Sequence, residues 1–242
     1  MSGVVGPRFS FPEINLTVWL KGDSGINTGT PIDGDAVYQW QDQSGNGNHF
    51  VQATAIRQPE YKASLINGLP GVFVDGTTFL ELLSQVIFSV DEGSVWIVAQ
   101  QTVTPPNFIN GGAFWSSTDG SFPPFMTLHS ERVSVWGNNI VFYDGYQGKT
   151  QVLIPEDNLP HYIGLNKSAT DIDYYADSST VFANKAHVED WTVYVEHILG
   201  DQLGLLNGTM IGNICEFIVY DKVLSTSEVA TVTNYLTNKY GI

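Results

Sequence analysis

The chain has 242 residues and a formal charge of −15, from 25 acidic and 10 basic side chains. Phosphate backbones and anionic membranes would repel such a surface, which argues against nucleic acid and membrane partners. Hydrophobic residues make up 43% of the chain, enough for a sizeable core, and β-sandwiches of this length are commonly one domain. The single cysteine, Cys215, excludes an intrachain disulfide and lies in an apolar strand pattern typical of a buried residue.

Short alternating runs of apolar and polar residues recur along the chain, separated by Gly- and Pro-containing turn signals. This pattern is typical of an antiparallel β-sandwich. No helical pattern of 10–15 residues separates the runs, which argues against alternating strands and helices. Long loops are expected at 104–124 and 183–190. The expected strands are 16–20, 37–40, 72–74, 79–82, 94–100, 125–129, 132–136, 140–143, 162–165, 172–175, 191–195 and 214–220.

The end of the chain carries the one clear helix signal. Ser225 and Glu228 form a capping box, apolar residues follow at helical spacing, and Gly241 sits where a C-terminal capping glycine belongs. We therefore predict a helix over 226–239. The sequence is divided into an N-terminal arm, 1–15, and one domain, 16–242.

Several short motifs lie near the two ends of the domain. They are LTVWLKG (16–22), WQDQSGNGNH (40–49), RQPEY (57–61), NGLP (67–70), VDG (74–76) and GNICEFIVYDKVLS (212–225). Together they resemble the laminin-G-like, concanavalin A-like domains of bacteria and phages. The resemblance implies an all-β fold, a two-sheet concanavalin A-like jelly-roll sandwich with one C-terminal helix. It implies little about function, because lectins, hydrolases, lyases and structural proteins share this fold.

A metal site is considered at the turn-forming segment 42–48. Asp42, Asn46 and Asn48 could give oxygens to a cation or a sugar, with Asp75 as a further candidate; the alternative is a rigid loop and a plain turn. Some members of the resembled family hold calcium through an acidic residue just before the conserved glutamate. Cys215 takes that place here, and a thiol is a poor calcium ligand, so Ca²⁺ as a cofactor is in doubt.

Carbohydrate binding needs aromatic faces for the C–H surface of a sugar, with carboxylates and amides for its hydroxyls. The alternative for each aromatic candidate is a place in the core or as a loop anchor. The candidates are Trp115 and Asp119 in the expected long loop, Tyr143, Asp144 and Tyr146 near the YDGYQGK turn, and Trp191.

Catalytic motifs are lacking. No E-x-D-x-x-E spacing of jelly-roll glucanases occurs, and adjacent acid pairs such as Glu156–Asp157 would point to opposite faces of a strand. The five histidines show no metal-binding spacing. We therefore expect no enzyme and no catalytic residues, although acids distant in sequence could still meet in the fold.

The favoured hypothesis is a non-enzymatic carbohydrate-recognition or structural module, used in a phage particle as a tail, fibre or decoration protein. The expected partners are a surface glycan or polysaccharide and other virion or surface proteins, with homo-oligomers allowed. The alternative is a polysaccharide-active hydrolase or lyase on the same fold. Residues 1–10 lack a signal-peptide pattern, so we expect cytoplasmic synthesis and a location on a virion or another extracellular surface.

Overall fold

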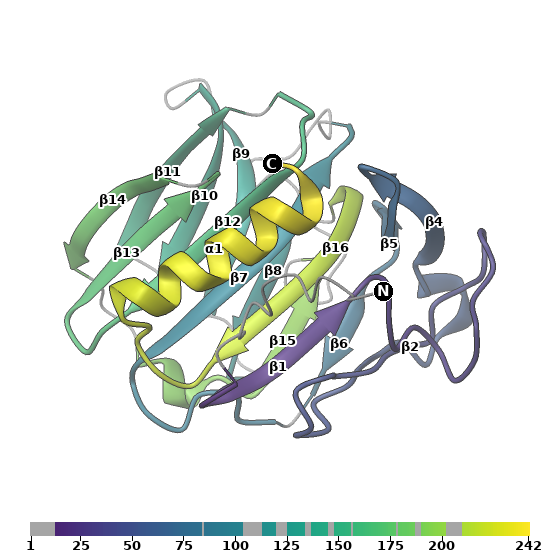
Figure 1. Cartoon of the computed structure of the whole chain (residues 1–242), viewed down its shortest axis with the longest axis horizontal. Helices are drawn as coiled ribbons and strands as arrows, with labels where there is room; N and C mark the ends of the chain where they lie inside the picture. The colour runs from purple at the N-terminus through teal and green to yellow at the C-terminus, as the bar shows by residue number, and fades with distance from the viewer. Residues whose placement is uncertain are drawn as a thin grey trace, which may run out of the picture.

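In the computed structural model, residues 13–83, 85–103, 113–119, 125–133, 137–144, 148–155, 157–177, 179–186, 190–201 and 210–242 are described. The strands in these ranges form two antiparallel eight-stranded sheets that pack face to face, with one helix on the outside (Figure 1). This confirms the predicted all-β, two-sheet sandwich with a C-terminal helix. The proposed arm, 1–15, lies almost entirely outside the described residues, and no described helix is long and apolar enough to cross a membrane.

One sheet, here called the front sheet, carries the helix on its outer face. Its strand order is β14 (Ser179–Ala186), β13 (Asp171–Ala176), β12 (His161–Lys167), β7 (Gly93–Gln101), β16 (Ile211–Tyr220), β5 (Leu69–Asp75) and β4 (Glu60–Ile66). β1 (Leu16–Lys21) also pairs with β16, beside its second half, whereas β5 pairs with the first half. The long strand β16 therefore connects both ends of the chain to the middle of the sheet.

The back sheet has the order β11 (Gly148–Pro155), β10 (Gly137–Asp144), β9 (Phe125–Val133), β8 (Ala113–Thr118), β15 (Glu196–Leu199), β6 (Leu80–Leu82), β3 (Phe50–Val51) and β2 (Gln39–Trp40). Two short 3-10 helices, η1 (Ala55–Arg57) and η2 (Trp191–Val193), connect strands. The core between the two sheets is rich in aromatic residues, which bury large areas each. It includes Trp40, Phe50, Phe88, Phe114, Trp115, Trp191 and Phe217.

The helix α1 (Thr226–Tyr240) covers the outer face of the front sheet. Ser225 and Glu228 form the predicted capping box, and Gly241 ends the helix in the left-handed conformation, with φ of 68°. Val232 and Leu236 are buried against Trp96 and Ile218 of the sheet in a second apolar cluster. The predicted helix is confirmed, and it is one residue longer than expected.

Three expectations about strands need correction. β8 lies inside the expected loop 104–124. Its six residues are all buried, so the strand lacks the alternation of apolar and polar residues that marks a strand with one exposed face. The expected strand 191–195 is instead η2, because Asp190 caps a turn by accepting a hydrogen bond from the backbone N–H of Thr192. β14 extends into the expected loop 183–190.

Candidate functional site

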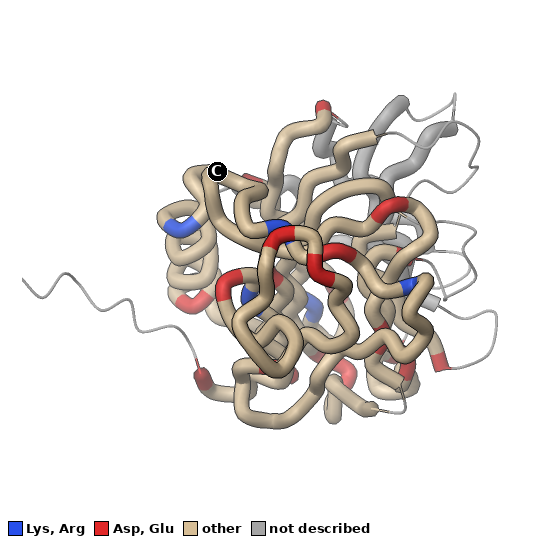
Figure 2. Tube along the Cα trace, turned by 90° about the vertical axis from the view of Figure 1, so that its right-hand side faces the viewer, with Lys and Arg blue, Asp and Glu red and all other residues tan. Residues whose placement is uncertain are grey.

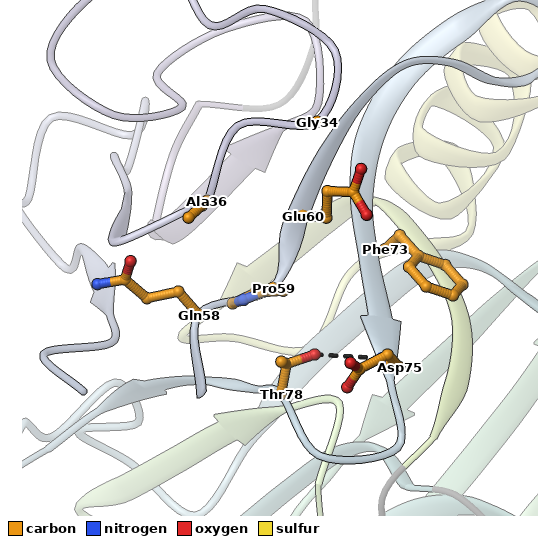
Figure 3. A pocket seen from close by; sticks show the side chains of 8 residues that line it. All are labelled: Gly34, Ala36, Gln58, Pro59, Glu60, Phe73, Asp75 and Thr78. Atoms are coloured by element: carbon orange, nitrogen blue, oxygen red, sulfur yellow. Dashed lines mark hydrogen bonds between the residues drawn. The ribbon is translucent and has the colours of Figure 1, made fainter. Parts of the chain in front are cut away.

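A pocket of about 270 Å³ opens at the edge of the front sheet, beside β4 and β5 (Figure 3). Its walls come from both strands, from the 34–36 segment and from the turn after β5. Residues 34–37 run along the edge of β4, joined by hydrogen bonds from Gly34 N to Tyr61 O and from Val37 N to Pro59 O. The lining side chains that can form hydrogen bonds with a ligand or stack on it are Gln58, Glu60, Phe73, Asp75 and Thr78.

The register between β4 and β5 brings the central residues together. Glu60 lies directly opposite Phe73, and Tyr61 lies opposite Val72. Val72 and Val74 point into the core, so Phe73 and Asp75 point to the outer face, because successive strand residues alternate. The ring of Phe73 is half-buried and Asp75 is exposed, which leaves an aromatic surface beside two carboxylates.

A tight turn fixes Asp75. Its Oδ1 accepts hydrogen bonds from the backbone N–H of Thr77 at 2.9 Å and from the Thr77 hydroxyl at 2.8 Å, while Asp75 N–H donates to Thr78 Oγ1 at 3.1 Å. Gly76 takes a φ of +89°, which suits glycine at this corner. Burial raises the pKa of the Asp75 carboxyl, but the hydrogen bonds from Thr77 and Thr78 lower it more, so the net pKa is below its usual value.

The electrostatic field of the pocket is negative. Lys62 Nζ lies 2.5 Å from Glu60 Oε1, so the nearest cation is already paired. Asp33 and Asp35 lie on the bordering segment; burial raises the pKa of the Tyr61 hydroxyl, and the carboxylates of Asp33 and Asp23 raise it further. The view onto this edge of the molecule shows acidic residues on several of the exposed turns (Figure 2).

The pocket has the chemistry that sugar recognition requires. Carboxylates, an amide and a hydroxyl are groups that pair with sugar hydroxyls, and a half-exposed aromatic ring offers a surface for sugar C–H groups. In the part of the chain that the structure describes, no three His, Cys, Asp or Glu side chains gather in a way that could hold a metal ion.

Two of the predicted sugar-binding aromatics lie elsewhere. Trp115, on β8, and Trp191, in η2, are each 0% exposed and meet in the core, with ring centroids 6.4 Å apart and planes at 71°. Trp191 also packs on Phe88, with Lys167 Nζ 5.5 Å from its ring centroid. A fully buried ring presents no face to a sugar in solution, so the prediction that these two line a binding groove is wrong. The alternative, a place in the core, describes both.

Asp119, Tyr143 and Asp144 belong to strands of the back sheet or follow one, away from β4 and β5. Asp119 is exposed just beyond the end of β8. Tyr143 and Asp144 are the last two residues of β10, opposite Thr127 and Met126 of β9. Tyr146 lies outside the described residues.

The segment 42–48 forms a closed network around β1. Asp42 is almost fully buried; its Oδ1 accepts from the backbone N–H groups of Trp19 and Ser44, at 2.8 and 2.9 Å. Its Oδ2 accepts from the Ser44 hydroxyl and from Asn48 N–H. The side-chain amides of Asn46 and Asn48 donate to the carbonyls of Leu16 and Thr17. Protein donors thus occupy both Asp42 oxygens, and the segment acts as the rigid loop that was the alternative prediction.

Asp75 does not join Asp42, Asn46 and Asn48 in one site. Asp75 pairs with Ile211 at the start of β16, whereas Trp19, which Asp42 binds, pairs with Ile218. Seven residues of extended strand separate these points, or about 20 Å. The grouping of these four residues as one metal site is therefore corrected.

Sequence reasoning missed Gln58, Glu60, Phe73 and Thr78. The signal was present, because the pocket is built from two of the motifs that were used only to identify the fold. RQPEY supplies Gln58 and Glu60, and VDG supplies Asp75. Their meeting depends on the pairing of β4 with β5, which no spacing within either motif reveals.

Cys215 is buried, as predicted, and burial raises the pKa of its thiol to about 12. A register shift between Ile214 and Glu216 marks a bulge in β16. Cys215 and Glu216 both contact α1 residues on the outer face of the sheet. The neutral thiol packs with the helix, at the position where some members of the resembled family have an acidic residue.

The chain matches no protein-family model and no curated protein sequence. In fold it is similar to domain 4 of AbnA, a GH43 extracellular arabinanase from Geobacillus stearothermophilus, solved in complex with arabinotriose; the TM-score is 0.65 at 13% identity, over 90% of this chain and 98% of that one. A GH54 α-L-arabinofuranosidase gives 0.63 at 16% identity over 85% of this chain. The binding domain of Paraclostridial Mosquitocidal Protein 1 gives 0.60 at 11% identity over 93%. This chain spans about half of each of the last two, at 51% and 53%, and at such identities the likeness shows a shared β-sandwich fold.

Proposed function

We propose that this chain is a non-enzymatic carbohydrate-recognition module whose ligand occupies the pocket between β4 and β5. The observation that carries the proposal is the half-buried Phe73, which lines the pocket together with its cross-strand partner Glu60 and with Asp75. The sandwich of similar fold solved with arabinotriose supports a saccharide as ligand.

The groups in the pocket favour binding over hydrolysis. A glycosidase needs a carboxylic acid with a raised pKa, so that it can protonate the leaving oxygen. The pKa of Asp75 is instead lowered by the hydrogen bonds of its turn, and Glu60 is paired with Lys62. Both groups are suited to accept hydrogen bonds from sugar hydroxyls.

The test is retention on a glycan array, followed by calorimetry with the glycans retained. Phe73→Ala should reduce affinity at least tenfold, because stacking supplies much of the apolar contact. Tyr38→Ala is the matched control, since Tyr38 is a part-exposed aromatic that does not line the pocket. Thermal melting shows that each variant is folded. No glycan retained, or equal losses in both variants, would count against the proposal.

A hydrolase remains the second candidate because of one observation on the back sheet. Glu81 and Glu196 share its outer face, since their neighbours Leu80, Leu82 and Leu199 are in the core. Burial raises the pKa of Glu81, and the negative charge of Glu196 raises it further. Reducing ends released from a polysaccharide, and lost in Glu81→Gln, would establish this activity and replace our proposal.

The resemblance of 16–82 and 212–242 to bacterial and phage domains supports a role on a virion or another extracellular surface, with the glycan belonging to a cell wall or capsule. Mass measurement in solution and detection in purified particles test this placement. A strict monomer that is found only in the cytoplasm would contradict it.

A further inference from the structure

We propose that the pocket between β4 and β5 accepts uncharged sugar units and excludes anionic ones: uronic acids, sialic acids and sulfated sugars. This inference rests on the proposed carbohydrate-binding function and names the ligand class of the same site. It follows from which charges face the pocket and which of them are already compensated.

The charges that line the pocket are unbalanced. Glu60 and Asp75 are both in its wall, and Lys62 pairs with Glu60. Lys62 Nζ lies 2.5 Å from Glu60 Oε1, whereas the partners of Asp75 Oδ1 are the neutral donors of Thr77. One ammonium therefore faces two carboxylates.

The surroundings add negative charge. Asp33 and Asp35 lie on the bordering segment, where their oxygens accept from the neutral backbone N–H groups of Ala63 and Ile32. The nearest arginine in sequence, Arg57, points elsewhere, because its guanidinium lies over the ring of Phe79 at 5.8 Å. Among the described residues, Arg57 is thus not placed to clamp a carboxylate or sulfate in the pocket, which is the usual means by which arginine binds such groups.

We expect the carboxylates of the pocket to attract a sugar hydroxyl and to repel a sugar carboxylate. Hydroxyls donate to ionised carboxylates in charge-assisted hydrogen bonds. A carboxylate on the sugar has no proton to donate at neutral pH and would lie beside the two like charges of the pocket wall. At the dielectric of a partly exposed site, we expect that repulsion to weaken binding on the order of tenfold or more.

The experiment compares matched glycans on the intact protein. A glycan array pairs each neutral hexose glycan with the counterpart in which C6 of one unit is oxidised to a uronate, and includes 3′-sialyllactose. We expect retention of neutral glycans and at least tenfold weaker binding of the oxidised partners in 20 mM salt. The difference in affinity between neutral and oxidised glycans should become smaller in 500 mM salt. Screening weakens the repulsion between exposed charges and leaves steric effects unchanged.

The double variant Glu60→Gln with Asp75→Asn tests the source of the selectivity. Both amides keep an acceptor oxygen, so the Asp75 turn is preserved while two charges are removed. This variant should bind a neutral glycan and its uronate with affinities within threefold of each other. Glu13→Gln with Glu92→Gln, outside the pocket, makes the same change in net charge and should keep the full preference.

The outcomes separate the two proposals. If no glycan is retained, the carbohydrate-binding function and this inference both fail. If uronates or sialyllactose bind as tightly as neutral glycans, or if the pocket variant keeps the preference, the selectivity is wrong and carbohydrate binding stands. If the Glu13 and Glu92 variant loses the preference for neutral glycans as fully as the pocket variant does, the preference comes from overall charge and the pocket is not its source.

Discussion

The ammonium of Lys239 lies 2.8 Å from Oε2 of Glu216, and this ion pair joins the last turn of α1 to the middle of the front sheet. Glu216 is 0% exposed. Its oxygens also accept hydrogen bonds from Trp19 Nε1, Tyr235 OH and Tyr240 OH, each at 2.7 Å. Because every acceptor position of this buried carboxylate is used, Glu216 fixes both the position of α1 on the sheet and the register of β1 against β16.

Lys239→Met should lower the free energy of unfolding by about 3 kcal/mol or more, because it leaves the buried Glu216 carboxylate without its cation. Urea unfolding followed by tryptophan fluorescence measures this. The control Glu13→Gln removes an exposed charge and should change stability by less than about 0.5 kcal/mol. A Lys239→Met protein as stable as the control would show that the ion pair does not anchor the helix.

Asp42→Ala should lower stability by about 2–4 kcal/mol while the folded protein keeps its affinity for ligand. The substitution leaves the N–H groups of Trp19, Ser44 and Asn48 without an acceptor at a part-buried corner. Glu13→Ala is the control, because Glu13 is an exposed acidic residue that does not line the pocket. An unchanged melting temperature with loss of ligand would instead make Asp42 a binding residue.

Stability should fall as pH rises above neutrality because of His161. Its Nδ1 lies 2.5 Å from Asp177 Oδ2 and its Nε2 lies 3.0 Å from Asp157 Oδ1. Burial lowers the pKa of His161, but these two partners raise it more, so the net pKa is above the usual value. The charged imidazolium therefore contributes fully below about pH 6.5, and that contribution is lost as pH rises through the higher pKa of the folded state.

Denaturant unfolding of the wild type and of His161→Gln between pH 5 and 9 checks this prediction. The stability difference between the two proteins should shrink as pH rises. Burial lowers the pKa of His197 to about 3, so His197 has the opposite effect, losing stability as pH falls through about 6.5, but it does so in both proteins and cancels in the difference. A difference that is constant across this range would contradict the assigned pair of partners.

Trp115→Ala should lower stability by about 3–5 kcal/mol, because it removes a large side chain from the core. Glycan binding by the molecules that stay folded should be unchanged. Phe73→Ala should give the converse result, a large loss of binding with a smaller loss of stability. Loss of binding in a folded Trp115→Ala protein would restore Trp115 as a binding residue.

Local sequence patterns determined the parts of this protein that depend on near neighbours. The capping box of Ser225 and Glu228 and the glycine after the helix are formed within a few residues, so the helix could be predicted almost to the residue. The strand at 16–20 was evident because Leu16, Val18 and Leu20 recur at every second position, and these are the residues that the structure buries. The closed loop of Asp42 follows from side-chain-to-backbone hydrogen bonds across two to six residues, although its contacts with β1 do not.

Tertiary structure decided which aromatic residues are accessible and where the pocket lies. Trp115 and Trp191 are 76 positions apart in the sequence, and only the packing of the two sheets places both rings in one core. Strand β8 was hidden because both of its faces are buried, so it has no alternating pattern. Glu60 and Phe73 became neighbours through the register of β4 and β5, and a shift of one residue would turn Phe73 into the core. Strand pairing is set by the burial of all strands together, which no single segment of the sequence encodes.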